Sequence, residues 1–354
     1  MSDLGLYIHV PFCRKKCPYC DFYSVGFRED TAEQYADAII RNLRYYNENY
    51  DTVYFGGGTP ILLAQHIPRI LAECNIAANA EITVECNPCE MGRETLEILY
   101  GAGVNRLSIG VQSAVNTELR SLGRTHTYEQ AERAVLTAHE VGFDEISVDI
   151  MLGIPEQDLS SLTYTINRLC ELPIIHVSAY LLKIESNTVF GKKPPVLPDE
   201  ETSAELYLSA VKMLTYNGFD HYEISNFAKC GNSSRHNLKY WRREEYLGVG
   251  AAAHSFYKGK RFAVARNMRE FIESPRQIEI TTDNAPDETE EKIMLGLRLT
   301  EGIEKTLWER VQCGLPFIPK QYCKIKNGRL SLTAEGFLVS NEIISTLLAH
   351  LEEL

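Results

Sequence analysis

Residues 7–24 read YIHVPFCRKKCPYCDFYS, a short apolar run followed at once by three cysteines. Cys13, Cys17 and Cys20 stand within eight residues, and Phe22 comes two positions later. Clustered thiolates are ligands of zinc or of iron–sulfur clusters. A structural zinc site normally closes with a fourth Cys or His, so three thiols favour a 4Fe–4S cluster with one iron open to another ligand. Zinc completed by a distant histidine and an unrelated group of thiols are the alternatives.

The rest of the ten cysteines are scattered, at positions 74, 86, 89, 170, 230, 313 and 323. In a cytosolic chain of this size, cysteines are more often metal-binding or free than paired in disulfides. Cys86 and Cys89 form a second Cys-x-x-Cys in ECNPCE. We interpret that pair as buried or incidental thiols beside a strand end, not as a second metal site.

The bulk properties are those of an ordinary globular protein. The chain has 354 residues, which favours two or three domains, and 44% of them are hydrophobic and 24% charged. The net charge of −12 gives a nucleic-acid partner no electrostatic support, so we expect none. The opening MSDLGLYIHV lacks the features of a signal peptide, and no apolar run is as long as a membrane span. We therefore expect a cytoplasmic protein without a transmembrane segment.

Short apolar runs alternate with stretches of helical spacing through the first two thirds of the chain. Strands are expected at LYIHV (6–10), TVYFGGG (52–58), EITVEC (81–86), RLSIGVQ (106–112), EISVDIML (145–152), IIHVSAYLL (174–182) and DHYEIS (220–225). Helices are expected over 31–46, 93–103 and 127–143, with Gly-containing ends as helix stops. This alternation predicts a parallel sheet of βαβ units, as a full or partial α/β barrel or, alternatively, a doubly wound sheet.

Polar residues fall at the carboxyl ends of these expected strands. Cys13, residues 56–59, Glu85, Gln112 and Asp149 all lie at or just beyond such an end. In an α/β barrel that rim is where active sites are built. We therefore expect these side chains to meet in one site.

The pattern is less regular after residue 200. A long helix (200–217) is expected before a segment rich in aromatics, Gly and His, and 273–288 reads as a linker. Helices near 287–299 and 303–312, a hairpin turning at Asn327-Gly328 and a helix from Ala334 then predict a winged-helix-like α+β domain. In so acidic a chain we expect it to pack or act as a lid, not to bind DNA. The predicted parts are 1–225, 226–272 and 273–354.

Six segments, in this order, closely resemble the radical S-adenosylmethionine (SAM) family in its HemN-like branch: YIHVPFCRKKCPYCDFYS, YFGGGTP, TVECNP, RLSIGVQS, LGRTHT and SVDIMLGIP. The resemblance extends from Tyr7 to about Ser255 and is weaker beyond. It implies a partial (βα)6 TIM-like barrel and a 4Fe–4S cluster on Cys13, Cys17 and Cys20. It also implies that the amino and carboxylate groups of SAM occupy the open iron.

The resemblance further implies a set of SAM-binding residues, and the chemistry of each suits that role. Glycines at 56–58 permit close backbone approach, Glu85 and Asp149 offer acceptors to an ammonium and to ribose hydroxyls, and Gln112 and Arg124 offer polar and cationic contacts. Tyr7 and Tyr19 either pack around the cluster and adenine or are core aromatics. The predicted set is Tyr7, Gly57, Gly58, Thr59, Glu85, Gln112, Arg124 and Asp149; no catalytic residue is assigned.

Two functions compete within this branch. One is the oxygen-independent coproporphyrinogen III dehydrogenase, a radical enzyme of haem biosynthesis; the other is a haem chaperone that binds haem and transfers it to acceptor proteins. The enzyme resembles Cys-x3-Cys-x2-Cys-x-Cys, whereas Phe22 stands here in the place of its last cysteine. RHNLKYW (235–241) resembles the His-Asn-x-x-Tyr-Trp motif of the chaperones. We therefore expect a haem chaperone.

The motif supplies the predicted haem-binding residues His236, Asn237, Tyr240 and Trp241, because an imidazole can ligate haem iron and aromatic rings can stack on the macrocycle. A histidine beside aromatics is otherwise a packing residue, so the iron ligand stays open, with His254 and Cys230 as weaker candidates. The expected partners are haem, haem-accepting proteins with membrane-bound ones among them, and a reducing protein such as flavodoxin or ferredoxin. A non-catalytic iron–sulfur or zinc scaffold is the alternative from another class.

Overall fold

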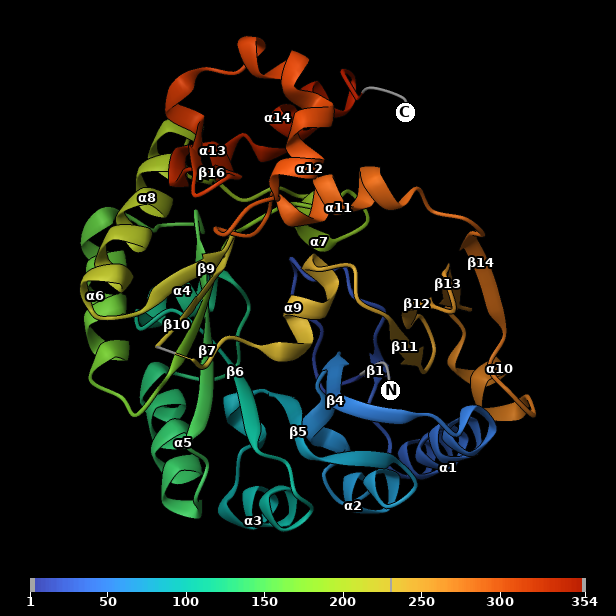
Figure 1. Cartoon of the computed structure of the whole chain (residues 1–354). Helices are drawn as coiled ribbons and strands as arrows, with labels where there is room; N and C mark the ends of the chain where they lie inside the picture. The colour runs from blue at the N-terminus through green and yellow to red at the C-terminus, as the bar shows by residue number, and fades with distance from the viewer. Residues whose placement is uncertain (1–3, 230, 352–354) are drawn as a thin grey trace.

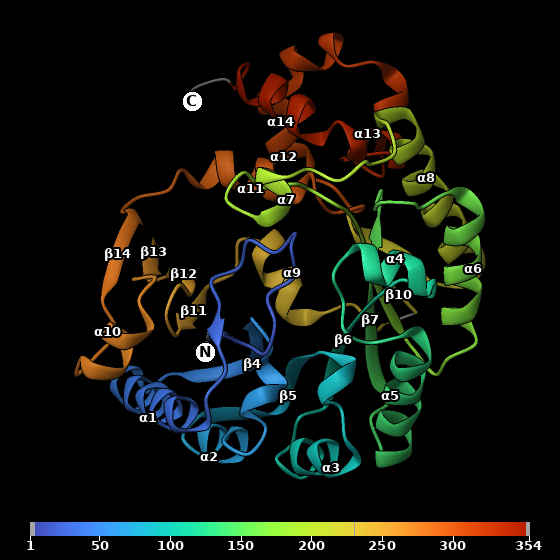
Figure 2. The same cartoon turned by 180° about the vertical axis from the view of Figure 1, so that it is seen from behind.

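The computed structural model describes residues 4–229 and 231–351. A 12-stranded sheet curves around a central lumen, and most helices cover its outer face (Figure 1). The view from behind shows the same horseshoe with its helices outside (Figure 2).

Six parallel strands follow one another in the sheet in their order along the chain: β1 (Leu4–Val10), β4 (Asn49–Gly57), β5 (Asn75–Cys86), β6 (Arg106–Gln112), β7 (Glu145–Leu152) and β8 (His176–Leu181). The connecting helices are α1 (Glu29–Tyr46), α2 (Ile67–Leu71), α3 (Arg93–Gly101), α4 (Asn116–Ser121), α5 (Tyr128–Val141) and α6 (Leu159–Cys170), with α8 (Glu200–Tyr216) after β8. A doubly wound sheet would reverse its strand order at a switch point, and this order does not reverse. The sheet ends at β14 on one side and β9 on the other, so the predicted partial (βα)6 barrel is confirmed.

Additional strands extend both ends of this barrel. β9 (Asp220–Glu223) and β10 (Asn226–Ala228) join antiparallel beyond β8, while β11 (Tyr246–Val249) joins parallel to β1. β12 (His254–Tyr257), β13 (Lys260–Val264) and β14 (Glu279–Asp283) continue antiparallel from β11. The short strands β2 (Phe12–Cys13) and β3 (Val25–Gly26) pair with each other, and the short helices α7 (Val189–Lys192), α9 (Arg235–Trp241) and α10 (Met268–Glu273) lie in the connections. The predicted boundaries at 225 and 272 stay a prediction.

One expected linker contains a strand. Within 273–288, β14 pairs with β13 along the edge of the sheet. All five β14 residues are exposed, so the segment carries no apolar period that a sequence reading can detect. Pairing with β13, not burial, makes it a strand.

Local signals explain where the barrel helices begin and end. Helix α1 places Tyr35, Ile39 and Leu43 on its buried side and stops where Asn47 takes a left-handed conformation (φ 48°). Helix α5 begins with a capping box between Thr127 and Gln130 and ends before Gly142. The helix ends at Asn47 and Gly142 let the chain turn back into the next parallel strands, β4 and β7.

The C-terminal part forms a helical unit with one hairpin, as expected. Its elements are α11 (Glu288–Gly296), α12 (Lys305–Trp308), 3₁₀ turns at Glu309–Phe317 and Lys320–Tyr322, β15 (Cys323–Lys326), β16 (Arg329–Leu332), α13 (Ala334–Leu338) and α14 (Ser340–Leu348). Asn327 and Gly328 have φ of 53° and 77°, as a type I′ turn requires. The unit lies beside α8 and β9 at the top of Figure 1. Within the described residues, no helix has the length and apolar character that crossing a bilayer needs.

Candidate functional site

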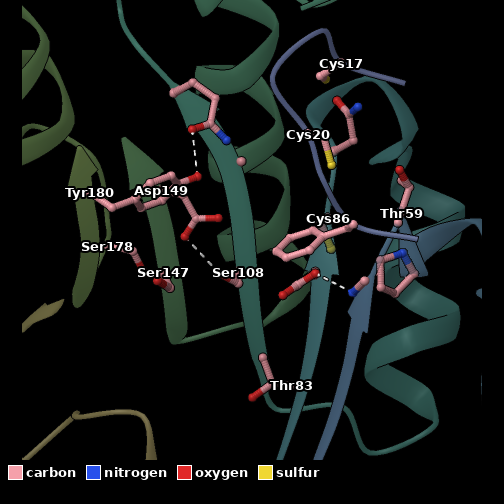
Figure 3. A pocket seen from close by; sticks show the side chains of 18 of the residues that line it. Cys17, Cys20, Thr59, Thr83, Cys86, Ser108, Ser147, Asp149, Ser178 and Tyr180 are labelled. Atoms are coloured by element: carbon pink, nitrogen blue, oxygen red, sulfur yellow. Dashed lines mark hydrogen bonds between the residues drawn. The ribbon is translucent and has the colours of Figure 1, made fainter. Parts of the chain in front are cut away.

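A cavity of about 360 Å³ opens at the carboxyl ends of the barrel strands, and Figure 3 shows part of its lining. The structure brings together the cysteines and all of the predicted SAM-binding residues except Tyr7. The predicted residues that line the cavity are Cys13, Cys17, Cys20, Gly57, Gly58, Thr59, Glu85, Gln112, Arg124 and Asp149. They come from β2, the cysteine loop, β4 to β7 and the loop after α4. Convergence of parallel strand ends on one rim explains why residues so far apart meet.

The three cysteines are half-buried at one end of this cavity. The Thr59 hydroxyl lies 3.6 Å from the Cys13 sulfur, and the Arg124 guanidinium lies 3.6 Å from the Cys17 sulfur. Burial raises the pKa of the Cys13 and Cys20 thiols. Metal binding needs thiolates, so loading this site would release protons.

The cysteine set fits an iron–sulfur cluster by its donor chemistry. Three thiols without a fourth protein thiol in the same loop suit a cluster that keeps one iron open. Across residues 4–229 and 231–351 no three His, Cys, Asp or Glu side chains stand in the arrangement of a formed metal site. The fit therefore rests on the thiols and their hydrogen-bond donors.

The glycine turn after β4 lies directly against the cysteine loop. Gly57 has φ of 116°, and its N–H donates to Glu85 Oε2 at 3.0 Å. A Cβ on Gly58 would lie 2.6 Å from the Phe12 carbonyl oxygen. Only glycine leaves room for the two backbones to approach this closely.

Two half-buried carboxyls face the cavity, Glu85 from β5 and Asp149 from β7. Burial and the neighbouring Asp149 raise the pKa of Glu85 to about 7, against hydrogen bonds from Tyr54 and the Gly57 N–H. Burial raises the pKa of Asp149 to about 6, although Ser108 donates to it at 3.1 Å (Figure 3). A cation placed between them would relieve both effects, so the chemistry of the pair suits a cationic group.

Gln112 and Arg124 complete the rim. Gln112 ends β6 with φ of 72°, and its Oε1 accepts from the Tyr180 hydroxyl at 3.2 Å. Arg124 donates to the Gly110 carbonyl at 2.8 Å while it faces Cys17. Burial lowers the pKa of Arg124, but Tyr19 and Cys17 outweigh it, so this guanidinium stays charged.

The sequence reading missed the hydroxyl-lined wall deeper in the cavity. Thr83, Ser108, Ser147 and Ser178 supply one hydroxyl from each of β5 to β8 (Figure 3). Thr83 and Ser147 stand two residues before Glu85 and Asp149, and that period of two could have identified them as inward-facing. They make the lumen polar where barrels are usually filled by Val, Ile and Leu.

The two tyrosines predicted beside the cluster and adenine separate in the structure. Tyr7 stacks on Tyr54 with ring centroids 6.2 Å apart, and its hydroxyl lies 3.0 Å from His9 Nδ1. Its side chain is not part of the cavity lining. Tyr19 does line the cavity, and its ring centroid lies 6.4 Å from that of Phe190 on α7.

Helix α9 carries the predicted haem motif across the inner side of the sheet (Figure 1). His236 is completely buried; its Nδ1 lies 2.8 Å from the Thr52 hydroxyl and its Nε2 lies 2.8 Å from the Tyr240 hydroxyl. Burial, with Lys239 nearby, lowers the pKa of His236 to about 3. Asn237 lines the same cavity as the cysteines, and Trp241 is half-buried. In this conformation both ring nitrogens of His236 are engaged.

The remaining candidates differ in their surroundings. His254 is exposed on β12, and Cys230 lies outside the described residues. Cys86 lines the cavity, whereas Cys89 is exposed with its sulfur 3.4 Å from the Thr125 hydroxyl.

Comparison with known proteins agrees with this geometry. The Radical SAM superfamily matches residues 7–169. A protein of Bacillus subtilis (strain 168) called heme chaperone HemW is 34% identical, over 98% of this chain and 99% of its own. A heme chaperone HemW of Escherichia coli (strain K12) is 37% identical, over 79% of this chain and 80% of its own.

A solved structure matches the whole architecture. Coproporphyrinogen III oxidase (HemN) from Escherichia coli, described as a radical SAM enzyme, superimposes with a TM-score of 0.84, covering 98% of this chain and 90% of that chain. Its sequence is 20% identical, so this likeness shows the fold alone.

Proposed function

Because this chain belongs to the HemW family of radical SAM proteins, we propose that it is a haem chaperone, which binds haem and transfers it to acceptor proteins. The observation that carries the proposal is a match to HemW proteins along nearly the full length, through the barrel and the C-terminal unit alike. Membership of the radical SAM family also implies a 4Fe–4S cluster and SAM.

We assign the cluster to Cys13, Cys17 and Cys20, and SAM to the adjoining cavity. When bound, the cluster supplies an electron and an open iron position. Glu85 and Asp149 then accept hydrogen bonds from the cationic and hydroxyl groups of SAM. The main chain at 56–58 approaches SAM closely, and the Arg124 guanidinium donates a hydrogen bond to the Cys17 sulfur.

Phe22 favours the chaperone over the decarboxylating enzyme. Its side chain lines the cavity and is 62% exposed. A phenyl ring neither ligates metal nor transfers a proton, so whatever a thiol at this position does in the enzyme is lacking here.

The proposal includes partners of three kinds: haem as cargo, haem-accepting proteins that include membrane-bound ones, and a one-electron donor such as flavodoxin or ferredoxin. Assignment of haem to His236, Asn237, Tyr240 and Trp241 stays a prediction. Ligation by His236 would need both of its ring hydrogen bonds to break, together with movement of α9.

The test uses the full chain after anaerobic reconstitution of its cluster. We expect stoichiometric binding of haem, transfer to an apo-haemoprotein, and no vinyl formation from coproporphyrinogen III under reducing conditions with SAM. Vinyl product would overturn the chaperone proposal, and so would a failure to bind haem. A SAM-dependent change in the cluster absorbance separates a SAM-binding protein from a passive iron–sulfur or zinc scaffold.

A further inference from the structure

The inference below rests on the proposed function, in which the protein binds haem as well as SAM. The cavity beside the cysteines is ill-suited to haem. Its volume is about 360 Å³, and hydroxyls together with Glu85 and Asp149 line it. Lys15, Lys16, Arg106 and Arg124 also line it, so its charges do not exclude the two carboxylates of haem. In the proposed function, however, SAM occupies this cavity, and haem is too large to share that volume with SAM. Haem therefore requires another surface.

A second and larger cavity, of about 870 Å³, is lined by residues at the end of α1, at the end of β12 and in the segment before β14. This size is within the range of sites for drug-sized ligands. Tyr45, Tyr46 and Tyr257 line it together with Ile278 and the cations Lys258 and Arg276. We call it the tyrosine cavity.

We propose that the tyrosine cavity binds ferric haem and that Tyr45 ligates the iron. Tyr45 is 57% exposed, so it lies at the surface of the cavity. Arg276 Nη1 donates to that oxygen at 2.9 Å, and its guanidinium carbon lies 5.6 Å from the ring centroid. Arg276 therefore holds the Tyr45 oxygen in a fixed position, and tyrosine is one of the axial ligands that hold iron in haem proteins.

The other two tyrosines serve as walls. The Tyr46 hydroxyl bonds to Glu279, and the Tyr257 hydroxyl bonds to Glu48. Burial and these carboxylates raise the pKa of both phenols, which keeps them protonated. The Tyr46 ring meets that of Tyr45 edge-on at 5.2 Å and that of Tyr257 edge-on at 6.1 Å. Together with Ile278 they offer apolar surface to a macrocycle.

The charges around the tyrosine cavity suit propionates. Two cations, Arg276 and Lys258, line the cavity, and Glu279 is the single carboxylate among its lining residues. This local excess of positive charge contrasts with the net charge of −12 for the whole chain. Lys258 is 70% exposed at its side chain and holds Glu48 at 3.2 Å, a surface ion pair that costs little to exchange for a propionate.

The two sites lie at opposite ends of the sheet. Asn49 begins β4 three residues after α1 ends, whereas Gly57 ends β4 beside the cysteines. A strand rises about 3.3 Å per residue, which separates the two rims by roughly 25 Å. Haem bound in the tyrosine cavity stays clear of the cluster and near the surface, where an acceptor can reach it.

The experiment titrates ferric haem into the cluster-loaded full chain and into Tyr45→Phe, Arg276→Gln and, as a matched control, Tyr216→Phe, whose ring is 91% exposed on α8. We expect Tyr45→Phe to lose the phenolate-to-iron charge-transfer absorption and to bind haem roughly tenfold or more weakly. Arg276→Gln should keep that absorption but bind haem more weakly, because the cavity loses a cation that a propionate can contact. Tyr216→Phe should match the wild type.

Circular dichroism and iron content, unchanged in every variant, exclude misfolding as the cause. A Tyr45→Phe variant with wild-type spectrum and affinity would overturn the inference while leaving the chaperone proposal standing. A spectrum altered in His236→Ala but not in Tyr45→Phe would overturn it too and place the ligand on α9. Wild-type protein that binds no haem at all would refute the proposed function itself.

Discussion

Arg124 connects the cysteine loop to strand β6. One guanidinium nitrogen faces Cys17 and another binds the Gly110 carbonyl on β6. The nitrogen that faces Cys17 lies 3.6 Å from its sulfur. Burial raises the pKa of the other two thiols of the loop, Cys13 and Cys20.

The cysteine assignment is tested by Cys17→Ser, with Cys89→Ser as the matched control. A serine hydroxyl does not replace a thiolate in a cluster, so the Cys17 variant should stay without the brown chromophore after anaerobic reconstitution. Cys89 is exposed outside the cluster loop, and its variant should load normally. Full iron and sulfide in Cys17→Ser would contradict the assignment.

Glu85 and Asp149 predict how SAM binding depends on pH. Their raised pKa values, about 7 and about 6, leave both partly protonated in neutral solution. A cationic ligand binds the ionised pair, so its affinity should rise with pH through this range, and binding should release protons. Glu85→Gln should weaken SAM binding and flatten the dependence of that affinity on pH. Calorimetry in buffers of different ionisation enthalpy measures both the affinity and the number of protons released.

Glu118→Gln is the control for that experiment. Glu118 is also a buried carboxyl with a pKa raised by burial, but it bonds to Ser113 outside the cavity. Its variant should keep both the affinity and the pH profile of the wild type. If Glu85→Gln and Asp149→Asn bind SAM like the wild type at every pH, the pocket is misplaced.

Among the elements, α9 depends most on a single distant residue. Glu81 on β5 accepts the N–H groups of Arg235 and His236, each at 2.9 Å, and thereby caps the helix. Glu81 is itself buried, with Arg106 at 3.8 Å. A strand of the barrel thus holds α9 across the lumen.

Glu81→Ala should loosen α9 before it disturbs the barrel. The lost cap leaves the buried His236 N–H without an acceptor, which costs about 1–3 kcal/mol, whereas the N–H of the exposed Arg235 can bond to water. Hydrogen exchange at residues 235–241 should accelerate while β4 to β7 stay protected. Glu145→Gln is the control, because Glu145 also contacts Arg106, at 3.2 Å, but does not touch α9. Equal protection of α9 in both variants would show that the cap is dispensable.

At the scale of the whole molecule, the C-terminal unit is joined to the barrel through β9. The Ile224 N–H donates to the Arg298 carbonyl at 2.9 Å, and the Thr300 N–H donates to the Tyr222 carbonyl at 3.1 Å. Between these contacts lies Glu223, completely buried, whose pKa is raised to about 7 by burial. Burial in this junction therefore favours the protonated, neutral form of the Glu223 carboxyl over its ionised form.

This junction predicts how stability depends on pH. The pKa of Glu223 in the unfolded chain is near 4.5, so between that value and about 7 the folded state binds more protons. Stability contributed by the protonated group is present at low pH and falls as pH rises through this window, by roughly 3 kcal/mol in all. Glu223→Gln stays neutral, so its loss of stability between pH 5 and pH 8, measured by denaturant unfolding, should be smaller than that of the wild type. An identical loss would contradict the prediction.

The sequence by itself determined the order of the six βα units, the grouping of three cysteines in one loop and the convergence of polar residues on one rim. Periodicity and turn residues are local signals, and parallel strands bring their carboxyl ends to one edge without further information. That is why Glu85 and Asp149 could be expected beside the cysteines. The strand β14, whose side chains are all exposed, gave no such signal.

Only the tertiary structure decided which groups each side chain meets. His236 reads as a haem ligand in its motif, yet Thr52, 184 residues away, binds one ring nitrogen while burial keeps the ring neutral. Tyr45 is one aromatic of many along the chain until Arg276, 231 residues away, donates to its hydroxyl. Burial and long-range partners set the protonation and accessibility of a side chain, and neither follows from its neighbours in the sequence.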